Sequence, residues 1–147
     1  MFKIGICDCN ARDISTLNTM ILMCSEEHDI QVYVEIYKSG AQLLSNLEKG
    51  EHIDLLFIEI DLGEEDGKEI VRRIQQELKI KDLKVVFISQ SVKDIMHLFE
   101  LKPYHFTTKP LQQELIEELI IEISRKHYRE IAFSHFSMGK VVSKKGS

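Results

Sequence analysis

The sequence predicts one α/β domain built on a doubly wound, five-stranded parallel sheet, and three observations carry this prediction. The chain has 147 residues, of which 44% are hydrophobic and 29% are charged, the composition of a single globular domain with a sizeable core. Short apolar runs alternate along the chain with segments whose apolar residues recur at helical spacing. The run at 53–58 is apolar except for Asp54, as expected of a parallel strand buried on both faces.

Each expected strand is a short apolar run or a strict alternation. The first run stops at Asp8, and the second segment alternates apolar and polar side chains as a half-buried strand does. The fourth run resembles the third, and the fifth is a short aromatic and β-branched piece that begins at Phe106. In chain order, the expected strands are 3–7, 31–37, 53–58, 83–88 and 106–108.

Each expected helix follows one strand and carries an apolar stripe at positions i, i+3, i+4 and i+7. Ser39-Gly40 opens the second helix and Gly50 closes it. The last helix has the strongest stripe, opposite a solvated face rich in glutamate. In chain order, the expected helices are 11–24, 40–50, 68–78, 92–99 and 111–126. Five strand-helix units in about 126 residues are typical of a doubly wound fold.

Charge and cysteine content exclude several classes of protein. A net charge of −5 and a pI near 5.7 argue against a chain that by itself binds nucleic acid or an anionic membrane. No segment has the roughly 20 apolar residues needed to cross a bilayer, and the N-terminus reads as a strand rather than a cleaved leader, so we expect a cytoplasmic protein. The three cysteines, Cys7, Cys9 and Cys24, make a disulfide framework unlikely.

Polar side chains stand at the ends of four expected strands. Asp8 and Cys9 follow the first strand and Glu59 the third, and Ser89 and Lys109 follow the fourth and fifth. In doubly wound sheets, ligands bind beyond the carboxyl ends of the strands, where strand order reverses. Carboxylates, a hydroxyl and a lysine converging there suit a phosphoryl group and a divalent cation.

These residues resemble the receiver domain of response regulators in two-component signalling. The resemblance covers 1–126 and rests on ICDCN, FIEIDLGEEDG, VVFISQS and FTTKPL at successive strand ends. It implies a flavodoxin-like (βα)5 fold with strand order 2-1-3-4-5. In the family, an acidic pair after the first strand holds Mg²⁺, and an Asp after the third strand accepts a phosphoryl group from a histidine kinase. A Ser or Thr and a Lys bind that group, and an aromatic side chain rotates inward as the readout.

Carried over residue by residue, the resemblance assigns these roles to matching positions. Asp8 is the first metal-binding acid, Ser89 the switch hydroxyl, Phe106 the aromatic readout and Lys109 the phosphate-binding lysine. Asp61 occupies the position whose backbone carbonyl would bind the metal. The peptide bond of Lys109-Pro110 is expected to be cis, because it is usually cis in the family.

Two positions depart from the family pattern. Glu59 occupies the phosphoacceptor position and a metal position, and Cys9 replaces the second metal-binding acid. Glu is one methylene longer than Asp, which misplaces an in-line attack, and a thiol is a poor Mg²⁺ ligand. We therefore expect weak or absent Mg²⁺ binding and doubtful phosphorylation. The chain would then be a weakened switch, or a phosphorylation-independent pseudo-receiver that binds protein partners; a phosphotransfer or hydrolase activity of its own is a third hypothesis, which we do not favour.

The expected partners follow from the resemblance. They are a sensor histidine kinase and a second copy bound through the face of the fourth helix, fifth strand and fifth helix. Residues 127–147 contain two strand-like pieces around Met138-Gly139-Lys140 and resemble the linker and first strands of a LytTR-type DNA-binding domain, truncated after about 20 residues. DNA binding and transcriptional control would require that output domain, and no membrane contact is expected.

Simpler interpretations remain open for several polar residues. Glu59 could merely balance the charge of Lys109, and Cys7 is better explained as a core residue than as a metal ligand with Cys9. Asp54 and the acids at 64–66 are expected to be solvated, with Asp66-Gly67 forming a turn. The six histidines fall in no metal-binding spacing and are expected at the surface.

Overall fold

The main sheet of the computed structural model is parallel and has the expected strand order. The structure describes residues 1–146, except for the side chains at 95, 96 and 135–146. Five strands pair in the order β2-β1-β3-β6-β7, and every neighbour is parallel. Their bounds are β1 (Phe2–Cys7), β2 (Val32–Tyr37), β3 (Leu55–Glu59), β6 (Lys84–Ser89) and β7 (His105–Thr108). The flavodoxin-like topology is therefore confirmed, with β6 and β7 as its fourth and fifth strands.

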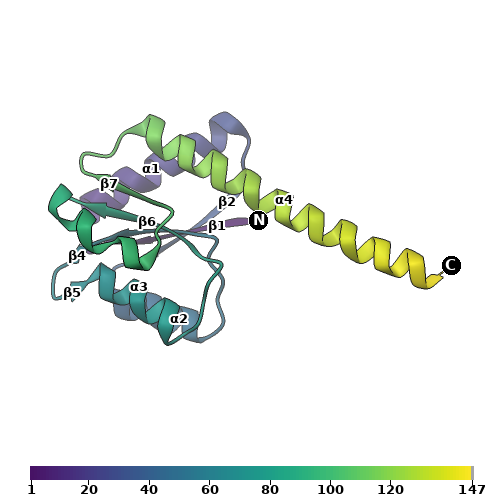
Figure 1. The fold of residues 1–147 in the computed structure, drawn as a ribbon. Helices are drawn as coiled ribbons and strands as arrows, with labels where there is room; N and C mark the ends of the chain where they lie inside the picture. The colour runs from purple at the N-terminus through teal and green to yellow at the C-terminus, as the bar shows by residue number, and fades with distance from the viewer. Residues whose placement is uncertain (147) are drawn as a thin grey trace.

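Alternation along β3 divides the core between the two faces of the sheet. Leu55 and Phe57 pack on one face, while Leu56 and Ile58 pack on the other, because successive side chains of a strand point in opposite directions. Helices α1 (Ala11–His28) and α4 (Gln113–Gly146) cover the first face, and α2 (Gly40–Glu48) and α3 (Gly67–Gln76) cover the second (Figure 1). All residues of β3 are buried, as predicted for a central parallel strand.

The register of the strands sets the height of the site residues. Cys7 of β1 lies opposite Ile58 of β3, so Asp8 comes level with Glu59. Glu59 in turn lies opposite Ile88, and Ser89 lies opposite Thr108. The polar strand ends therefore share one edge of the sheet.

A small antiparallel hairpin between β3 and α3 was not predicted. It consists of β4 (Asp61–Leu62) and β5 (Glu65–Asp66). The turn needs Gly63, whose φ of 82° lies in the left-handed region. The hairpin also corrects the prediction for Glu65, which is not simply solvated: its carboxylate accepts hydrogen bonds from the amides of Gly40 and Ala41 at 2.8 and 3.0 Å and caps the N-terminus of α2.

The segment expected as a fourth helix at 92–99 forms two 3₁₀-helices instead. They are η1 (Val92–His97) and η2 (Phe99–Leu101). The amide of Lys93 donates to the Ser91 hydroxyl at 3.2 Å, and the amide of Lys102 closes η2 on the carbonyl of Phe99 at 3.1 Å. 3₁₀-helices usually occur as short pieces, and these two have six and three residues.

The prediction of two strands after residue 126 is wrong. One helix, α4, runs from Gln113 to Gly146 and crosses the expected boundary without a break, projecting away from the sheet (Figure 1). The segment from 113 to 138 contains no glycine or proline, and an isolated two-stranded hairpin is marginal in water, so continuation of the helix is favoured. Among the residues that the structure describes, no helix could span a lipid bilayer.

Asp54 is buried rather than solvated, at 8% exposure. Its carboxylate accepts the Lys3 amide at 2.8 Å, and it lies 2.7 Å from Nε2 of His52 and 3.5 Å from Nδ1 of His127. It joins β1, the start of β3 and α4 at the amino-terminal edge of the sheet. His28, His52 and His97 are exposed as expected, His105 and His127 are half-buried, and the side chain of His135 lies outside the described residues.

Candidate functional site

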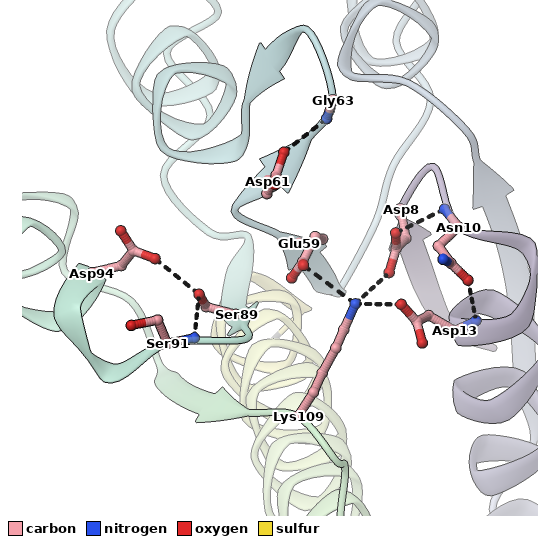
Figure 2. Close-up of polar contacts among 10 residues, drawn as sticks. All are labelled: Asp8, Asn10, Asp13, Glu59, Asp61, Gly63, Ser89, Ser91, Asp94 and Lys109. Carbon is pink, nitrogen blue, oxygen red and sulfur yellow. Dashed lines mark hydrogen bonds and ion pairs between the residues drawn. The ribbon is translucent and has the colours of Figure 1, made fainter.

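The ammonium of Lys109 is the centre of an acidic cluster at the carboxyl edge of the sheet (Figure 2). Its Nζ lies 3.4 Å from Oδ2 of Asp8, 3.2 Å from Oε1 of Glu59 and 2.6 Å from Oδ2 of Asp13. Asp8 directly follows β1, Glu59 is the last residue of β3, and Lys109 directly follows β7. The structure thus brings together Asp8, Glu59 and Lys109, as the sequence predicted.

Backbone contacts hold Lys109 and Glu59 in place. The Lys109 amide donates to the carbonyl of Ser89 at 2.9 Å, which extends the pairing of β6 and β7 by one residue. The Lys109-Pro110 bond is cis, as expected. Behind Glu59, the amide of Gly67 donates to the carbonyl of Ile60 at 2.7 Å, and a Cβ on Gly67 would lie 2.2 Å from the Glu59 carbonyl oxygen. Only glycine allows this approach.

Asp13 belongs to the cluster, and the sequence analysis missed it. Asn10 caps α1 by accepting the Asp13 amide at 3.0 Å, and the Asn10 amide donates to Oδ1 of Asp8 at 3.0 Å. Asp13 is therefore the third residue of α1, the usual place for an acid in the first turn. An Asn followed three residues later by an acid was the available signal, since it resembles a capping box and directs that acid to the same end of the sheet.

The cluster carries more negative than positive charge, and this affects the pKa of Glu59. Three carboxylates surround one ammonium, and Oε2 of Glu59 is buried with no hydrogen-bond partner. Burial raises the pKa of Glu59 to about 7; the Lys109 charge opposes this rise and the Asp8 charge adds to it. Burial also lowers the pKa of Lys109, but the hydrogen bond to Asp13 and the charges of Asp8 and Glu59 outweigh it, so the pKa is raised. Lys109 stays charged while Glu59 titrates near neutrality.

Ser89 is at the same edge of the sheet but is bonded away from the cluster. Its hydroxyl donates to Oδ2 of Asp94 at 2.9 Å and accepts the Ser91 amide at 3.1 Å (Figure 2). Asp94, in η1, is a second polar residue that sequence reasoning missed, because its role depends on the 3₁₀ turn. Phe106 is half-buried and packs against the core between the sheet and α2 and α3.

A surface pocket of about 440 Å³ borders the cluster, and Asp8, Asp13 and Lys109 form part of its wall. An incoming small anion or cation can therefore approach Asp8, Asp13 and Lys109 from solvent. Cys9 is exposed, and its thiol is free; Cys7 is a buried core residue, as expected. Burial raises the pKa of Cys7 to about 12, so it remains a thiol.

Comparison with known proteins identifies the family. The model of the response regulator receiver domain matches residues 11–121. The chain belongs to this family. A search of curated proteins found no match.

Solved structures share the fold of this receiver at low sequence identity. The response regulatory domain of protein mrkE from Klebsiella pneumoniae has 19% identity and a TM-score of 0.74 over 87% of this chain and 99% of that one. A CheY-like receiver domain protein from Methanospirillum hungatei JF-1 has 16% identity and a TM-score of 0.70 over 88% and 98%. The Mn²⁺-bound form of response regulator Rcp1 has 18% identity and a TM-score of 0.67 over 84% and 91%.

The donor set of this receiver fits a divalent cation in part. Asp8 and Glu59 supply hard carboxylate oxygens, and the unpartnered Oε2 of Glu59 lacks any competing protein donor. Oδ1 of Asp61 accepts the Gly63 amide at 3.0 Å; the metal-binding role expected for Asp61 concerns its backbone carbonyl. Cys9 offers sulfur where an oxygen is preferred. When bound, a cation of this kind would neutralise charge that Lys109 alone leaves uncompensated.

Proposed function

We propose that this receiver is a switch in which phosphoryl transfer from a sensor histidine kinase to Glu59 is impaired. The supporting observation is the Lys109 cluster. The lysine that would bind a phosphoryl group already contacts three carboxylates, one of them Glu59 at 3.2 Å. The ion pair that phosphorylation would create therefore exists in part without it, although one carboxylate carries less charge and fewer oxygens than a phosphoryl group.

The chemistry of Glu59 supports the same proposal. An acyl phosphate forms only when an ionised carboxylate attacks phosphorus, and a pKa of about 7 leaves about half of the Glu59 side chains protonated at neutral pH. The extra methylene moves the attacking oxygen, and an error of about 1 Å can cost on the order of a hundredfold in rate. Lys109 would hold the carboxylate, and Ser89 would have to release Asp94 before its hydroxyl could contact a phosphoryl oxygen.

The remaining roles follow from the family and belong to the same proposal. Asp8, Glu59 and the carbonyl of Asp61 would hold Mg²⁺, with low affinity because Cys9 contributes no oxygen. Phe106 would read out the state of Ser89. Homodimers would form through the face of η1, η2, β7 and α4, and control of transcription would require a LytTR-type DNA-binding output domain. We do not propose turnover of a substrate.

A second candidate function is a pseudo-receiver that acts by binding proteins and never accepts a phosphoryl group. The observation that favours it is the hydrogen bonding of Ser89, which is satisfied by Asp94 and Ser91. With Lys109 and Ser89 both engaged, the receiver would keep one state, and its protein partners would recognise that state.

Intact-mass analysis after incubation with acetyl phosphate and Mg²⁺ separates these functions. We expect no stable phosphate adduct on the native chain and an adduct on the variant that combines Glu59→Asp with Cys9→Asp. Glu59→Asp alone tests the nucleophile, and Cys9→Asp alone tests the metal position. A stable adduct on native Glu59 would refute impaired transfer and would overturn the pseudo-receiver as well. Failure of the double variant to react would favour the pseudo-receiver, because the contacts of Ser89 and Lys109, rather than Glu59 and Cys9, would then be what prevents phosphorylation.

A further inference from the structure

A group of metal-binding side chains lies between α1 and α4, away from the Lys109 cluster. Glu27 and His28 end α1, and Glu117 projects from α4. One ligand atom from each lies within 4.8 Å of the others, and no other such group of three occurs among the side chains that the structure describes. Asp13 and His28 are 15 positions apart on α1, which corresponds to about 22 Å of helix, so this group is separate from the receiver site.

The contact between His28 and Glu117 has the dimensions of a metal site. Nε2 of His28 lies 3.3 Å from Oε1 of Glu117. Two ligands about 2.0–2.1 Å from a tetrahedral Zn²⁺ ion are about 3.3 Å apart. The observed separation therefore leaves room for an ion that both atoms could contact with little movement of either side chain.

The hydrogen bonding of Glu117 points the same way. Its Oε1 atom is buried and accepts no hydrogen bond in the structure, although it faces the imidazole of His28. A buried carboxylate oxygen without a donor is costly. A cation between Oε1 and Nε2 would satisfy this oxygen, and the carboxylate of Glu27 would complete a set of one nitrogen and two oxygen ligands, with solvent in the fourth position.

We propose that Glu27, His28 and Glu117 bind a divalent transition-metal ion of the Zn²⁺ class and thereby fasten α1 to α4. Zn²⁺ accepts imidazole nitrogen as well as carboxylate oxygen, whereas Mg²⁺ binds carboxylates but prefers oxygen ligands alone, so the imidazole of His28 favours the Zn²⁺ class. Glu117 lies on the part of α4 that packs against the sheet, before this helix leaves the domain at about Tyr128. Metal binding would therefore hold α4 against α1 just before α4 projects from the receiver domain.

Cys24 lies one turn before His28 on α1 but is not part of the proposed site. It is fully buried and is not among the residues whose ligand atoms lie within 4.8 Å of one another, which are Glu27, His28 and Glu117. Co²⁺ bound at the site would therefore lack the charge-transfer absorption of a cobalt–thiolate bond.

Calorimetry with Zn²⁺ tests the proposal on the full chain, stripped with a chelator and kept in excess Mg²⁺. We expect one Zn²⁺ per chain and a loss of at least about tenfold in affinity for His28→Ala and for Glu117→Gln, since even indirect partners of a metal contribute about 10–100-fold. The matched controls are His97→Ala and Glu118→Gln, which change exposed residues of the same type and should bind as the native chain does. Zn²⁺ should raise the melting temperature of the native chain and of both controls, and it should leave the melting temperatures of the His28→Ala and Glu117→Gln variants unchanged.

Two results would overturn the proposal. One is that the native chain binds no Zn²⁺ at 100 μM ion, because we take roughly 100 μM as the weakest dissociation constant that would still support a Zn²⁺ site. The other is native affinity in the His28→Ala, Glu117→Gln double variant, above all if His52→Ala abolishes it, because the ion would then bind near Asp54. If Glu117→Gln does not fold, the exposed substitutions Glu27→Gln and His28→Ala still decide the outcome.

Discussion

The pH dependence of stability should reveal the buried carboxyl group of Glu59. Its pKa is raised from an ordinary 4.5 to about 7 in the folded chain. Between these values the folded state keeps a proton that the unfolded state has lost, so the free energy of unfolding falls as pH rises. The contribution is fully present below pH 4.5 and is lost above pH 7. At about 1.4 kcal/mol per pKa unit, the total loss is about 3 kcal/mol.

The substitution that isolates this effect is Glu59→Gln, because glutamine has the shape of the protonated side chain and cannot ionise. We expect the variant and the native chain to have similar free energies of unfolding at pH 5, and the variant to be more stable by about 2–3 kcal/mol at pH 8. Lys109 keeps two partners in the variant, Asp8 and Asp13. Urea unfolding followed by circular dichroism, in the presence of a chelator, measures the difference at each pH.

The control is Asp61→Asn, which neutralises an exposed acid of the same loop and preserves an acceptor for the Gly63 amide. Its stability relative to the native chain should change little between pH 5 and pH 8. A flat difference for Glu59→Gln, or a native chain that gains stability over the variant as pH rises, would refute the reasoning. It would mean that Lys109 compensates Glu59 fully.

Three further substitutions test the packing and pairing around the site and at the opposite edge. Lys109→Met leaves buried carboxylates without a countercharge, and we expect it to lower the free energy of unfolding at pH 8 by about 3–5 kcal/mol in urea. Gly67→Ala places a methyl group 2.2 Å from the Glu59 carbonyl oxygen, and overpacking should cost about 1–3 kcal/mol in the same assay. Asp54→Ala removes the acceptor of the Lys3 amide, which should cost about 1–3 kcal/mol and speed hydrogen exchange at that amide.

Each of these expectations has a control or an opposite outcome. Lys93→Met and Asp82→Ala change exposed charges nearby and should each alter stability by less than about 0.5 kcal/mol. Alanine usually stabilises a helix relative to glycine, so a gain in stability for Gly67→Ala would show that the backbone at Glu59 yields. A Lys109→Met variant as stable as Lys93→Met would show that the cluster contributes little to folding.

The sequence alone was enough to predict the strands and helices of the domain and the edge of the sheet at which the polar site residues gather. Hydrophobic period separates strands from helices, and strands buried on both faces, such as 53–58, read as continuous apolar runs. Since parallel strands end at one edge, the polar residues that follow them must meet there. Asp8, Glu59 and Lys109 were predicted to converge for this reason, and the structure places all three within ion-pair distance.

Only the tertiary structure decided how these groups share their charge. Asp13 contacts Lys109 because Asn10 caps α1 at the same edge of the sheet. Ser89 donates a hydrogen bond to Asp94 because η1 is a 3₁₀ turn. The periodicity of the sequence predicts neither contact. The continuation of α4 past residue 126 depended on whether this segment is more stable as a helix or as an isolated two-stranded hairpin, which is marginal in water. His28 and Glu117 are 89 residues apart and meet only because α1 and α4 pack on the same face of the sheet. Long-range contacts of this kind arise from packing, whereas the sequence pattern reports local periodicity.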